Sequence, residues 1–443
     1  MTAAAPNWLE SAPGAGVRMH ALMARLFPIC RSITGDGVRE TLRILGESLP
    51  LTIHEVPTGT QVFDWTVPRE WRIREAWIRD AQGRKIVDFR DSNLHVVSYS
   101  TPVRARLALA ELKPHLHSLP DHPDWIPYRT SYYNDAWGFC LPHRQLESLG
   151  DGEYEVLVDS ELFDGALSYG ECEIKGQSDE EVLIFAHTCH PSLANDNLSG
   201  LALASLLANQ LHGMSRRYTY RFVFAPATIG SITWLARNRE RLGRIRHGLV
   251  CTVAGHPGRP VYKRSRHGTA EIDRAAVCAL RDTGRDHEIL DFSPWGYDER
   301  QFGSPGINLP VGRLTRTPNG CYPEYHTSAD NLALVSPAAL EEMLGLYMNV
   351  INVIENNGRY RNLSPFGEPQ LGRRGLYRKL GGQQDIGLHQ NAMLWALNFS
   401  DGSHSLLDIA ERSGLPFAAI AHAVQDLVGA GLLAPAETTG ATS

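Results

Sequence analysis

The segment HTCHPSLANDNLSG, residues 187–200, holds the side chains best suited to chemistry. It directly follows the apolar run EVLIFA and supplies His187, His190 and Asp196 within one loop. Imidazole nitrogens and carboxylate oxygens are zinc ligands, and a catalytic zinc uses about three protein ligands while one position stays open. The spacing therefore indicates a metal site at the end of a strand.

A second polar cluster, PEYHTSADNL, lies far along the chain and supplies Glu324, His326 and Asp330. A lone histidine is more often a hydrogen-bonded core residue than a ligand. Two separate clusters, each beside a predicted strand end, favour the metal site. We expect His326 to be a further ligand and Asp330 to be an outer acceptor or a helix cap.

Hydrolysis at neutral pH also needs a proton acceptor near the metal. The carboxylates available by motif are Glu324, two residues before His326, and Asp298 or Glu299 in GYDERQFGSPG. We expect Glu324 to be the base, with Asp298 as the next candidate. A surface carboxylate or a salt bridge is the alternative for Glu324.

Three arginines are candidate substrate contacts because a guanidinium fork can hold a carboxylate with two hydrogen bonds. Arg300 and Arg313 flank predicted turns, and Arg129 lies in the aromatic stretch PYRTSYYNDAWGFC. That stretch predicts a lid or substrate wall, or else aromatic packing within a small β module. Structural ion pairs are the alternative for Arg300 and Arg313. We expect Cys189 to be buried or near the metal, and not a nucleophile.

The periodicity predicts the elements that must position these residues. Residues 1–50 form two helices, and residues 51–175 form short β-rich pieces typical of an inserted β domain. Residues 176–360 alternate strands and helices, which predicts an α/β core with a mainly parallel sheet. Ligand sites of such sheets lie beyond the carboxyl ends of the strands, where His187 falls.

Residues 375–436 have the helix, turn and helix pattern of a winged helix, with Gly414 in the turn. Its candidate recognition helix, PFAAIAHAVQDLVGAG, has no Lys or Arg to neutralise phosphates. We therefore expect a packing or protein-contact role and no nucleic-acid partner.

Composition supports a globular chain of 443 residues, with 43% hydrophobic and 21% charged residues and a net charge of -6. This charge gives no reason to expect nucleic acid or an anionic membrane, so we expect a small-molecule or peptide substrate; a homo-oligomer stays open. No signal peptide or spanning segment is evident, which predicts a cytoplasmic protein. Seven cysteines without a C-x-x-C pair argue against a disulfide framework or zinc knuckle.

AHTCHPSLANDNLSG followed by YHTSAD resembles the co-catalytic zinc aminopeptidases. With WTVPREW, TIGSITWL, DERQF and EYHTSADNL, nearly the whole chain resembles a bacterial aminopeptidase-like branch with an inserted β domain and a C-terminal winged helix. The resemblance implies that His187, Asp196 and His326 are metal ligands, with Asp196 bridging if two metals bind. His190 has no counterpart in that pattern and is expected to replace a missing donor.

The chain departs from the aminopeptidase pattern at two places. Where those enzymes carry a Glu-Glu pair, FAPATIGS has Ala225 and Ala227. Where a further Asp ligand is expected, CTVAGH offers Thr252 and His256. We therefore expect one zinc ion, and the second stays open.

Together these patterns predict a zinc-dependent, aminopeptidase-like hydrolase that cleaves an amide or peptide bond in a small substrate. A mononuclear zinc acyltransferase or cyclase is the alternative, because attack by an amine needs no activated water. A binding protein that kept the scaffold without catalysis is the third.

Overall fold

The computed structural model describes residues 14–376 and 386–436. The chain divides into two compact units, a larger one (Ser11–Gly268 with Glu288–Leu344) and a smaller one (Thr269–His287 with Gly345–Ser443). The N-terminal stretch behind the localisation prediction and part of the predicted unit 375–436 lie outside the described residues. Within the described ranges, no helix combines the length and apolarity needed to cross a membrane.

The larger unit is built on an eight-stranded sheet in the order β1-β10-β12-β11-β13-β16-β14-β15. Its four central strands, β12, β11, β13 and β16, pair in parallel, whereas β1, β10 and β14 pair antiparallel with the strands on their inner side. The prediction of an α/β fold with a mainly parallel sheet is confirmed. The strand bounds are β1 (Thr52–Pro57), β10 (Ala166–Ile174), β11 (Glu181–His187), β12 (Thr219–Ala225), β13 (Ile245–Cys251), β14 (Pro260–Lys263), β15 (Glu288–Leu290) and β16 (Val311–Arg316).

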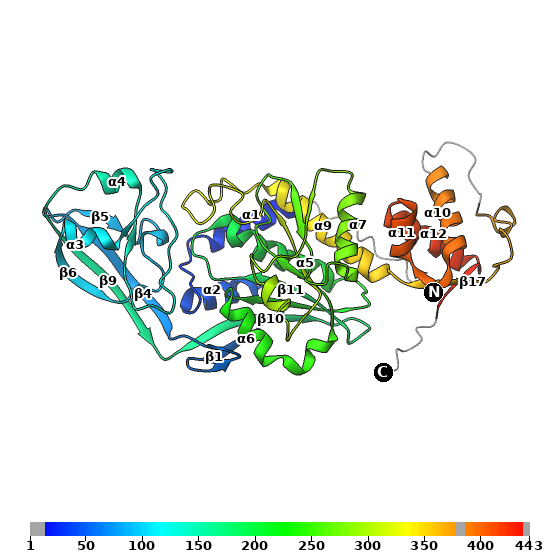
Figure 1. Ribbon diagram of the computed structural model, residues 1–443, viewed down its shortest axis with the longest axis horizontal. Coiled ribbons are helices and arrows are strands. Elements are labelled where there is room, and N and C mark those ends of the chain that lie inside the picture. Colours follow the sequence, from blue (N-terminus) through cyan, green and yellow to red (C-terminus); the bar gives the residue numbers. More distant parts are fainter. Residues whose placement is uncertain (1–13, 377–385, 437–443) are drawn as a thin grey trace. The chain divides into compact units, whose positions relative to one another are not determined.

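Strand β11 has seven consecutive buried residues, as expected for a central parallel strand covered on both faces. Helix α5 packs across β10 to β13, and α1 packs on α5 (Figure 1). The helices and strands predicted between residues 15 and 251 are confirmed in type and order. The helices of this unit are α1 (Ala15–Leu26), α2 (Asp36–Leu45), α3 (Leu109–Leu112), α4 (His143–Glu147), α5 (Gly200–His212), α6 (Ile229–Arg237) and α8 (Glu299–Phe302), with short helical turns η1 (Asn93–His95), η2 (Lys113–His115), η3 (Ala194–Ser199) and η4 (Arg239–Arg244).

A separate four-stranded antiparallel sheet, in the order β5-β4-β9-β6, forms the inserted module. Its strands are β4 (Glu70–Arg79), β5 (Lys85–Asp88), β6 (Val103–Ala108) and β9 (Glu153–Phe163). Two further two-stranded pairs lie in the same range of the chain, β2 (Gln61–Val62) with β3 (Trp65–Thr66) and β7 (Leu116–His117) with β8 (Phe139–Cys140). The range 51–175 also encloses β1 and β10, which pair with each other and extend the central sheet. The alternation of apolar and polar residues along a strand predicts which of its faces is buried. It does not predict which sheet the strand joins.

The smaller unit contains a three-stranded sheet, β18-β17-β19, packed with helices α10, α11 and α12 (Figure 1). Gly414 ends α11 with φ of 70°, a left-handed conformation that glycine adopts without strain. The predicted winged helix is confirmed, and β17 places a strand of its sheet before residue 375. The bounds are α7 (Glu271–Asp282), α9 (Pro337–Asn356, which begins in the larger unit), β17 (Arg359–Asn362), η5 (Gly372–Arg374), α10 (Ile386–Phe399), β18 (Asp401–Ser405), α11 (Leu406–Ser413), α12 (Phe417–Gly429) and β19 (Leu433–Pro435).

Candidate metal centre

One carboxylate, that of Asp196, lies between two histidines at the carboxyl end of β11. His187, the last residue of that strand, has Nε2 at 2.9 Å from Asp196 Oδ1. His326 comes from the far end of the chain and has Nε2 at 3.1 Å from Asp196 Oδ2. The side chains of His187 and Asp196 are fully buried, whereas that of His326 is 34% exposed, so the centre meets solvent on the His326 side.

His190 completes a group of three side chains that could hold a metal ion. Ligand atoms of His187, His190 and Asp196 all lie within 4.8 Å of one another. Two ligands of one tetrahedral zinc lie about 3.4 Å apart, given bonds near 2.0–2.1 Å. The separations between these ligand atoms lie on both sides of that value. Side-chain shifts of about an ångström would therefore place all three ligand atoms around one ion. Nδ1 of His187 is buried and has no hydrogen-bond partner in the described structure.

The protonation states of this group also suit a cation. Burial holds the pKa of His190 well below its usual range, which keeps the ring neutral. Burial alone would raise the pKa of Asp196, but the neighbouring histidines and the hydrogen bonds from His187 and His326 hold it well below its usual range. A neutral imidazole beside an ionised carboxylate is the form in which these residues bind metals.

The polar residues of the ANDNLS motif fasten this loop to the end of β13. Asn195 Oδ1 accepts a hydrogen bond of 2.9 Å from the Gly255 N–H, and Ser199 Oγ accepts one of 2.8 Å from the Ala254 N–H. Asn197 Nδ2 donates to the carbonyl oxygen of His187 at 3.3 Å. The amides and hydroxyl on either side of Asp196 thus act as braces for the loop that carries it.

Asp330 lies directly behind the loop and contacts its backbone. Its Oδ1 accepts a hydrogen bond of 2.6 Å from the N–H of Asn195, and its Oδ2 accepts one of 3.0 Å from the N–H of Asp196. Burial raises the pKa of Asp330 to about 7, against the opposing effect of the Asn195 N–H. The structure therefore makes Asp330 a support of the Asp196 backbone.

Arg31 is a contact of this centre that the sequence did not reveal. Its Nε donates to the carbonyl oxygen of His190 at 2.9 Å, and its Nη1 donates to that of Leu26 at 2.7 Å. The side chain is 1% exposed, and burial lowers its pKa to about 10. A buried guanidinium in the turn between two helices carries no sequence signal, because its partner lies 159 residues away.

Aromatic rings enclose the histidines. Tyr128 makes edge contacts with His190 and His326, with ring centroids 5.3 and 5.2 Å apart. Tyr297 stacks on His187 at 5.4 Å, and Tyr325 stacks on His326 at 3.9 Å. Tyr128 belongs to the aromatic stretch expected to be a lid or substrate wall, and its backbone N–H donates to the His326 carbonyl oxygen at 2.8 Å.

The C-terminal end of that aromatic stretch packs within the inserted β module, which was the alternative role. Phe139 is fully buried in the hydrophobic core of the inserted module. Arg129, from the same stretch, is exposed, and its charge acts on His117 and Cys140 in the module. The stretch thus contributes both to the wall of the centre and to the packing of the module.

The two carboxylates considered as bases lie in different surroundings. Asp298 is fully buried, its Oδ1 accepts a hydrogen bond of 2.6 Å from Ser231 Oγ, and its Oδ2 has no partner within the described structure. Burial raises its pKa to about 6, while the charge of His187 opposes the rise. Glu324 is partly buried, and its charge acts on His256. Of the two carboxylates, Asp298 is therefore the one that interacts electrostatically with His187 of β11.

Glu299 forms a buried cluster with two cations. Its Oε1 lies 2.9 Å from Lys263 Nζ and 3.5 Å from Arg313 Nη1. All three side chains are at most 3% exposed. Arg313 also lies over the Tyr297 ring, with its guanidinium carbon 5.2 Å from the centroid. The structural ion pair anticipated as the alternative for Arg313 is present, and the same side chain contacts the ring that stacks on His187.

Arg300 and Cys189 complete the set of predicted residues. Arg300 is partly buried, with Nε buried and unpaired among the described residues, and its charge acts on Asp298. Cys189 is buried, and burial raises the pKa of its thiol above the ordinary range. A protonated, buried thiol is a poor nucleophile, as expected for Cys189.

The departures from the aminopeptidase pattern persist in three dimensions. Ala225 ends β12, and Ala227 follows it without any carboxylate at this strand end. Thr252 is fully buried, and His256 Nδ1 pairs with Thr317 Oγ1 at 2.7 Å. Neither residue reaches the three-ligand group, so the donors brought together are His187, His190 and Asp196, with His326 on the second carboxylate oxygen.

Comparison with known proteins agrees with this fold. The family model described as "Domain of unknown function (DUF4910)" matches residues 20–357, and one described as a winged helix-turn-helix matches residues 358–435. A protein of Clostridium acetobutylicum, provisionally named as a polysaccharide biosynthesis protein with an aminopeptidase-like domain, is 50% identical over 427 residues. The match covers 96% of this chain and 98% of that protein.

Two solved structures are similar over most of the chain. A crystal structure from Clostridium acetobutylicum, provisionally described as a peptidase, has a TM-score of 0.91 at 49% identity and covers 95% of this chain and 97% of that chain. A zinc aminopeptidase from Bacillus subtilis has a TM-score of 0.59 at 13% identity, covering 78% and 96%. The second likeness establishes an aminopeptidase-like fold, which confirms the resemblance inferred from the motifs.

Proposed function

We propose that this chain, which belongs to the DUF4910 family, is a zinc-dependent hydrolase that cleaves an amide or peptide bond in a small substrate. The observation that carries the proposal is the convergence of His187, His190 and Asp196 within 4.8 Å at the carboxyl end of a parallel strand. This is the position at which α/β folds place their active sites.

The donor set fits zinc. Two imidazoles and one carboxylate match the three protein ligands of catalytic zinc sites and leave a position open. A bound zinc ion supplies Lewis-acid chemistry, polarising a substrate carbonyl and making water more acidic. His326, on the second oxygen of Asp196, adds a fourth ligand or one side of a second site.

Asp298 and Glu324 are the residues proposed to accept a proton from water. A base works best when its pKa lies near the working pH. Asp298, with a pKa raised to about 6 by burial, meets that condition and interacts electrostatically with His187. Glu324, first choice from the sequence, has a buried Oε2 without a partner among the described residues. The burial and the raised pKa of Asp298 favour it as the base.

The substrate is proposed to be small and to carry a group that the local cations recognise. Arg300 and Arg313 both follow Tyr297 in the chain, and Arg313 contacts its ring. Both are proposed to hold a substrate carboxylate, whereas the charge of Arg129 acts on Cys140 in the inserted module. The name of the Clostridium acetobutylicum relative, which refers to polysaccharide biosynthesis, favours an amide on a sugar derivative over a peptide.

Acyl transfer or cyclisation is the second candidate reaction. The observation that favours it is the strand end at Ala225 and Ala227, which lacks the carboxylate pair that the resemblance implies for hydrolysis. An amine nucleophile needs less activation than water, so such a reaction tolerates the loss. A binding protein without catalysis would keep the metal group and turn over no amide.

We propose no nucleic-acid or membrane partner. Helix α12, the candidate recognition helix, contains no Lys or Arg, and non-specific binding to DNA depends on neutralising phosphates. Self-association through the winged helix remains open, and sedimentation of the full chain measures it directly.

The test is release of a free amine by the zinc-loaded protein from acylated amino sugars and short peptides. Hydrolysis predicts amine release that is lost in Asp298→Asn with zinc content unchanged. Glu324→Gln run in parallel decides between the two bases, because only one of the variants should lose turnover. Zinc binding with acylated product and no free amine supports transfer, and zinc-free protein without turnover contradicts both enzymatic proposals.

A further inference from the structure

Exposed aromatic rings gather on the β2–β3 hairpin of the larger unit. Phe63 and Trp65 are 44% and 43% exposed, and Tyr133, beside Trp65, is 53% exposed. The Trp65 and Tyr133 rings lie 5.5 Å apart and are tilted by 57°. Large aromatic side chains normally bury most of their surface, so three partly exposed rings in one place mark a candidate binding surface.

A hollow of about 430 Å³ lies against Phe63 and Trp65, and we call it the aromatic hollow. Phe63 and Trp65 form one side of it, and Ile232 and Leu235 of α6 form another. Its volume falls within the range of small-molecule sites.

Polar groups line the rest of this hollow. Asp64, Gln301 and Ser304 supply acceptors and donors, and Arg239 supplies a guanidinium. Arg239 is exposed, and its guanidinium carbon lies 6.0 Å from the Phe63 ring centroid. No ion pair of Arg239 occurs among the described residues. Flat apolar rings thus lie beside hydroxyl-binding groups and one available cation.

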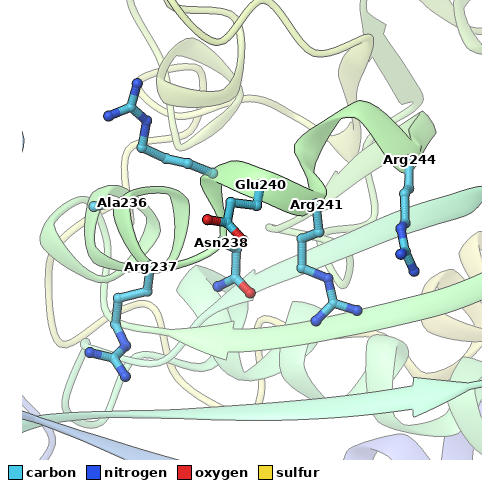
Figure 2. Close-up of a pocket in the computed structure, with 7 residues that line it drawn as sticks. Ala236, Arg237, Asn238, Glu240, Arg241 and Arg244 are labelled. Atoms are coloured by element: carbon cyan, nitrogen blue, oxygen red, sulfur yellow. The ribbon is translucent and has the colours of Figure 1, made fainter.

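Arg239 also lines a second hollow, of about 880 Å³, formed by residues 236–241 and 244. Figure 2 shows Arg237, Arg241 and Arg244 projecting to the same side of this segment. Arg241 is paired with carboxylates of the sheet, whereas Arg244 is exposed. The two hollows therefore share Arg239, the first residue of η4.

We propose that the aromatic hollow binds a saccharide that carries an anionic group. A sugar ring has an apolar face of C–H bonds and a rim of hydroxyl groups, which matches rings bordered by Asp64, Gln301 and Ser304. A carboxylate or phosphate on the sugar matches Arg239, whose planar fork binds either group with two hydrogen bonds. Carboxylated and phosphorylated sugars share this chemistry.

Nucleic acid fits the same surface less well, although bases also stack on aromatic rings. The net charge of the chain is -6, and acidic Asp64 and Glu240 lie in the two hollows. A polyanion needs several phosphate contacts along its length. The mixture of one or two available cations with nearby carboxylates suits a ligand of low charge.

The aromatic hollow neighbours the candidate metal centre without sharing its ligands. Ile232 follows Ser231, which donates to Asp298, and Gln301 lies in α8, which begins at Glu299 directly after Asp298. The proposed saccharide site is therefore separate from the chemistry and goes beyond the proposed function. Binding there does not require that the metal centre be catalytic.

Titration calorimetry on the full chain tests the site with a glucuronic acid oligosaccharide, glucose 1-phosphate, a neutral glucose oligosaccharide and inorganic phosphate. We expect a charged saccharide to bind with Kd below about 5 mM and the neutral one at least about tenfold more weakly. A tighter Kd for the uronic acid assigns a carboxylated ligand, and a tighter Kd for the sugar phosphate assigns a phosphorylated one.

Trp65→Ala, Phe63→Ala and Arg239→Ala should each weaken binding at least about tenfold. Phe366→Ala, at a fully exposed ring of the smaller unit, and Arg106→Ala, at an exposed arginine of β6, are matched controls that should bind like wild type. Removing metal with a chelator should leave the affinity unchanged, which separates this site from the proposed function.

Three results overturn the proposal. The first is no binding by either charged saccharide, and the second is wild-type affinity in both ring variants with folding confirmed by circular dichroism. The third is that inorganic phosphate or a single-stranded oligonucleotide binds through Arg239 as tightly as the sugars, which assigns the surface to phosphate alone.

Discussion

Asp330 Oδ2 accepts a hydrogen bond of 3.0 Å from the backbone N–H of Asp196, the residue whose carboxylate two histidines share. The Asp330 side chain therefore holds the loop of the candidate metal centre in place by binding the backbone of that loop. A structural effect of changing Asp330 should appear in both stability and metal affinity.

Asp330→Ala should lower the free energy of unfolding by about 3 kcal/mol, because it leaves the buried N–H groups of Asn195 and Asp196 without acceptors. Asp330→Asn keeps one acceptor oxygen and should cost about 1 kcal/mol. Urea unfolding measures both. Asp135→Ala, at an 81% exposed carboxylate, should change stability by less than about 0.5 kcal/mol. Equal stability of Asp330→Ala and wild type would rule out the support role.

The zinc content of the protein should depend on the three proposed ligands His187, His190 and Asp196. We expect about one equivalent per chain by elemental analysis, as the three-ligand set implies. His187→Ala and Asp196→Asn should lose it, because each removes a ligand from the buried group. His212→Ala changes an exposed histidine at the end of α5 and should keep the metal. Full zinc occupancy in Asp196→Asn would contradict the assignment.

The convergence of His187, His190 and Asp196 could be predicted because the three residues lie close together in the sequence. His187 ends a run of buried apolar residues, and His190 and Asp196 follow within the same turn, so strand pattern and spacing suffice to bring them together. The late residues His326 and Asp330 were found through a motif. Their contacts with Asp196, one through the side chain and one through the backbone, follow only from the folded chain.

The contacts of Arg31 and Tyr297 could not be predicted. Arg31, between the two N-terminal helices, donates to the His190 carbonyl oxygen, and Tyr297 stacks on His187 at the end of β11. Neither contact leaves a spacing pattern in the chain. The choice of Glu324 over Asp298 as the base stays a prediction, because proximity in sequence to His326 does not tell which carboxyl group is buried and interacts electrostatically with His187.

The pH dependence of stability should report the buried Asp298. Burial raises the pKa of this carboxyl group from 3.8 to about 6, so between these values the folded chain binds more protons than the unfolded chain. Its contribution is fully present below about pH 4 and is lost as the pH rises through 6, which lowers the free energy of unfolding by about 3 kcal/mol.

Asp298→Asn should remove that decline in chelator-treated protein, and the difference from wild type should grow between about pH 4 and pH 7. Asp135→Asn, at an exposed site, should keep the wild-type profile. Urea unfolding at several pH values gives both curves. Parallel curves for wild type and Asp298→Asn would show that the carboxyl group titrates normally.

Tyr128 should orient the two histidines through its ring and not through its hydroxyl group. The ring meets His190 and His326 edge-on at 5.3 and 5.2 Å, while the hydroxyl group lies 2.8 Å from that of Tyr132. Tyr128→Phe keeps the ring and should hold zinc with an affinity within about threefold of wild type. Tyr128→Ala frees both imidazoles to rotate and should weaken zinc binding by about 10 to 100-fold, the usual cost of losing a group that orients a ligand. Competition with a chromogenic chelator measures both affinities. The control is His115→Ala, at a ring stacked on Trp137 in the inserted module.

Equal losses of zinc affinity in Tyr128→Phe and Tyr128→Ala would assign the effect to the hydroxyl pair with Tyr132. The Tyr128 ring would then have no role in orienting the histidines.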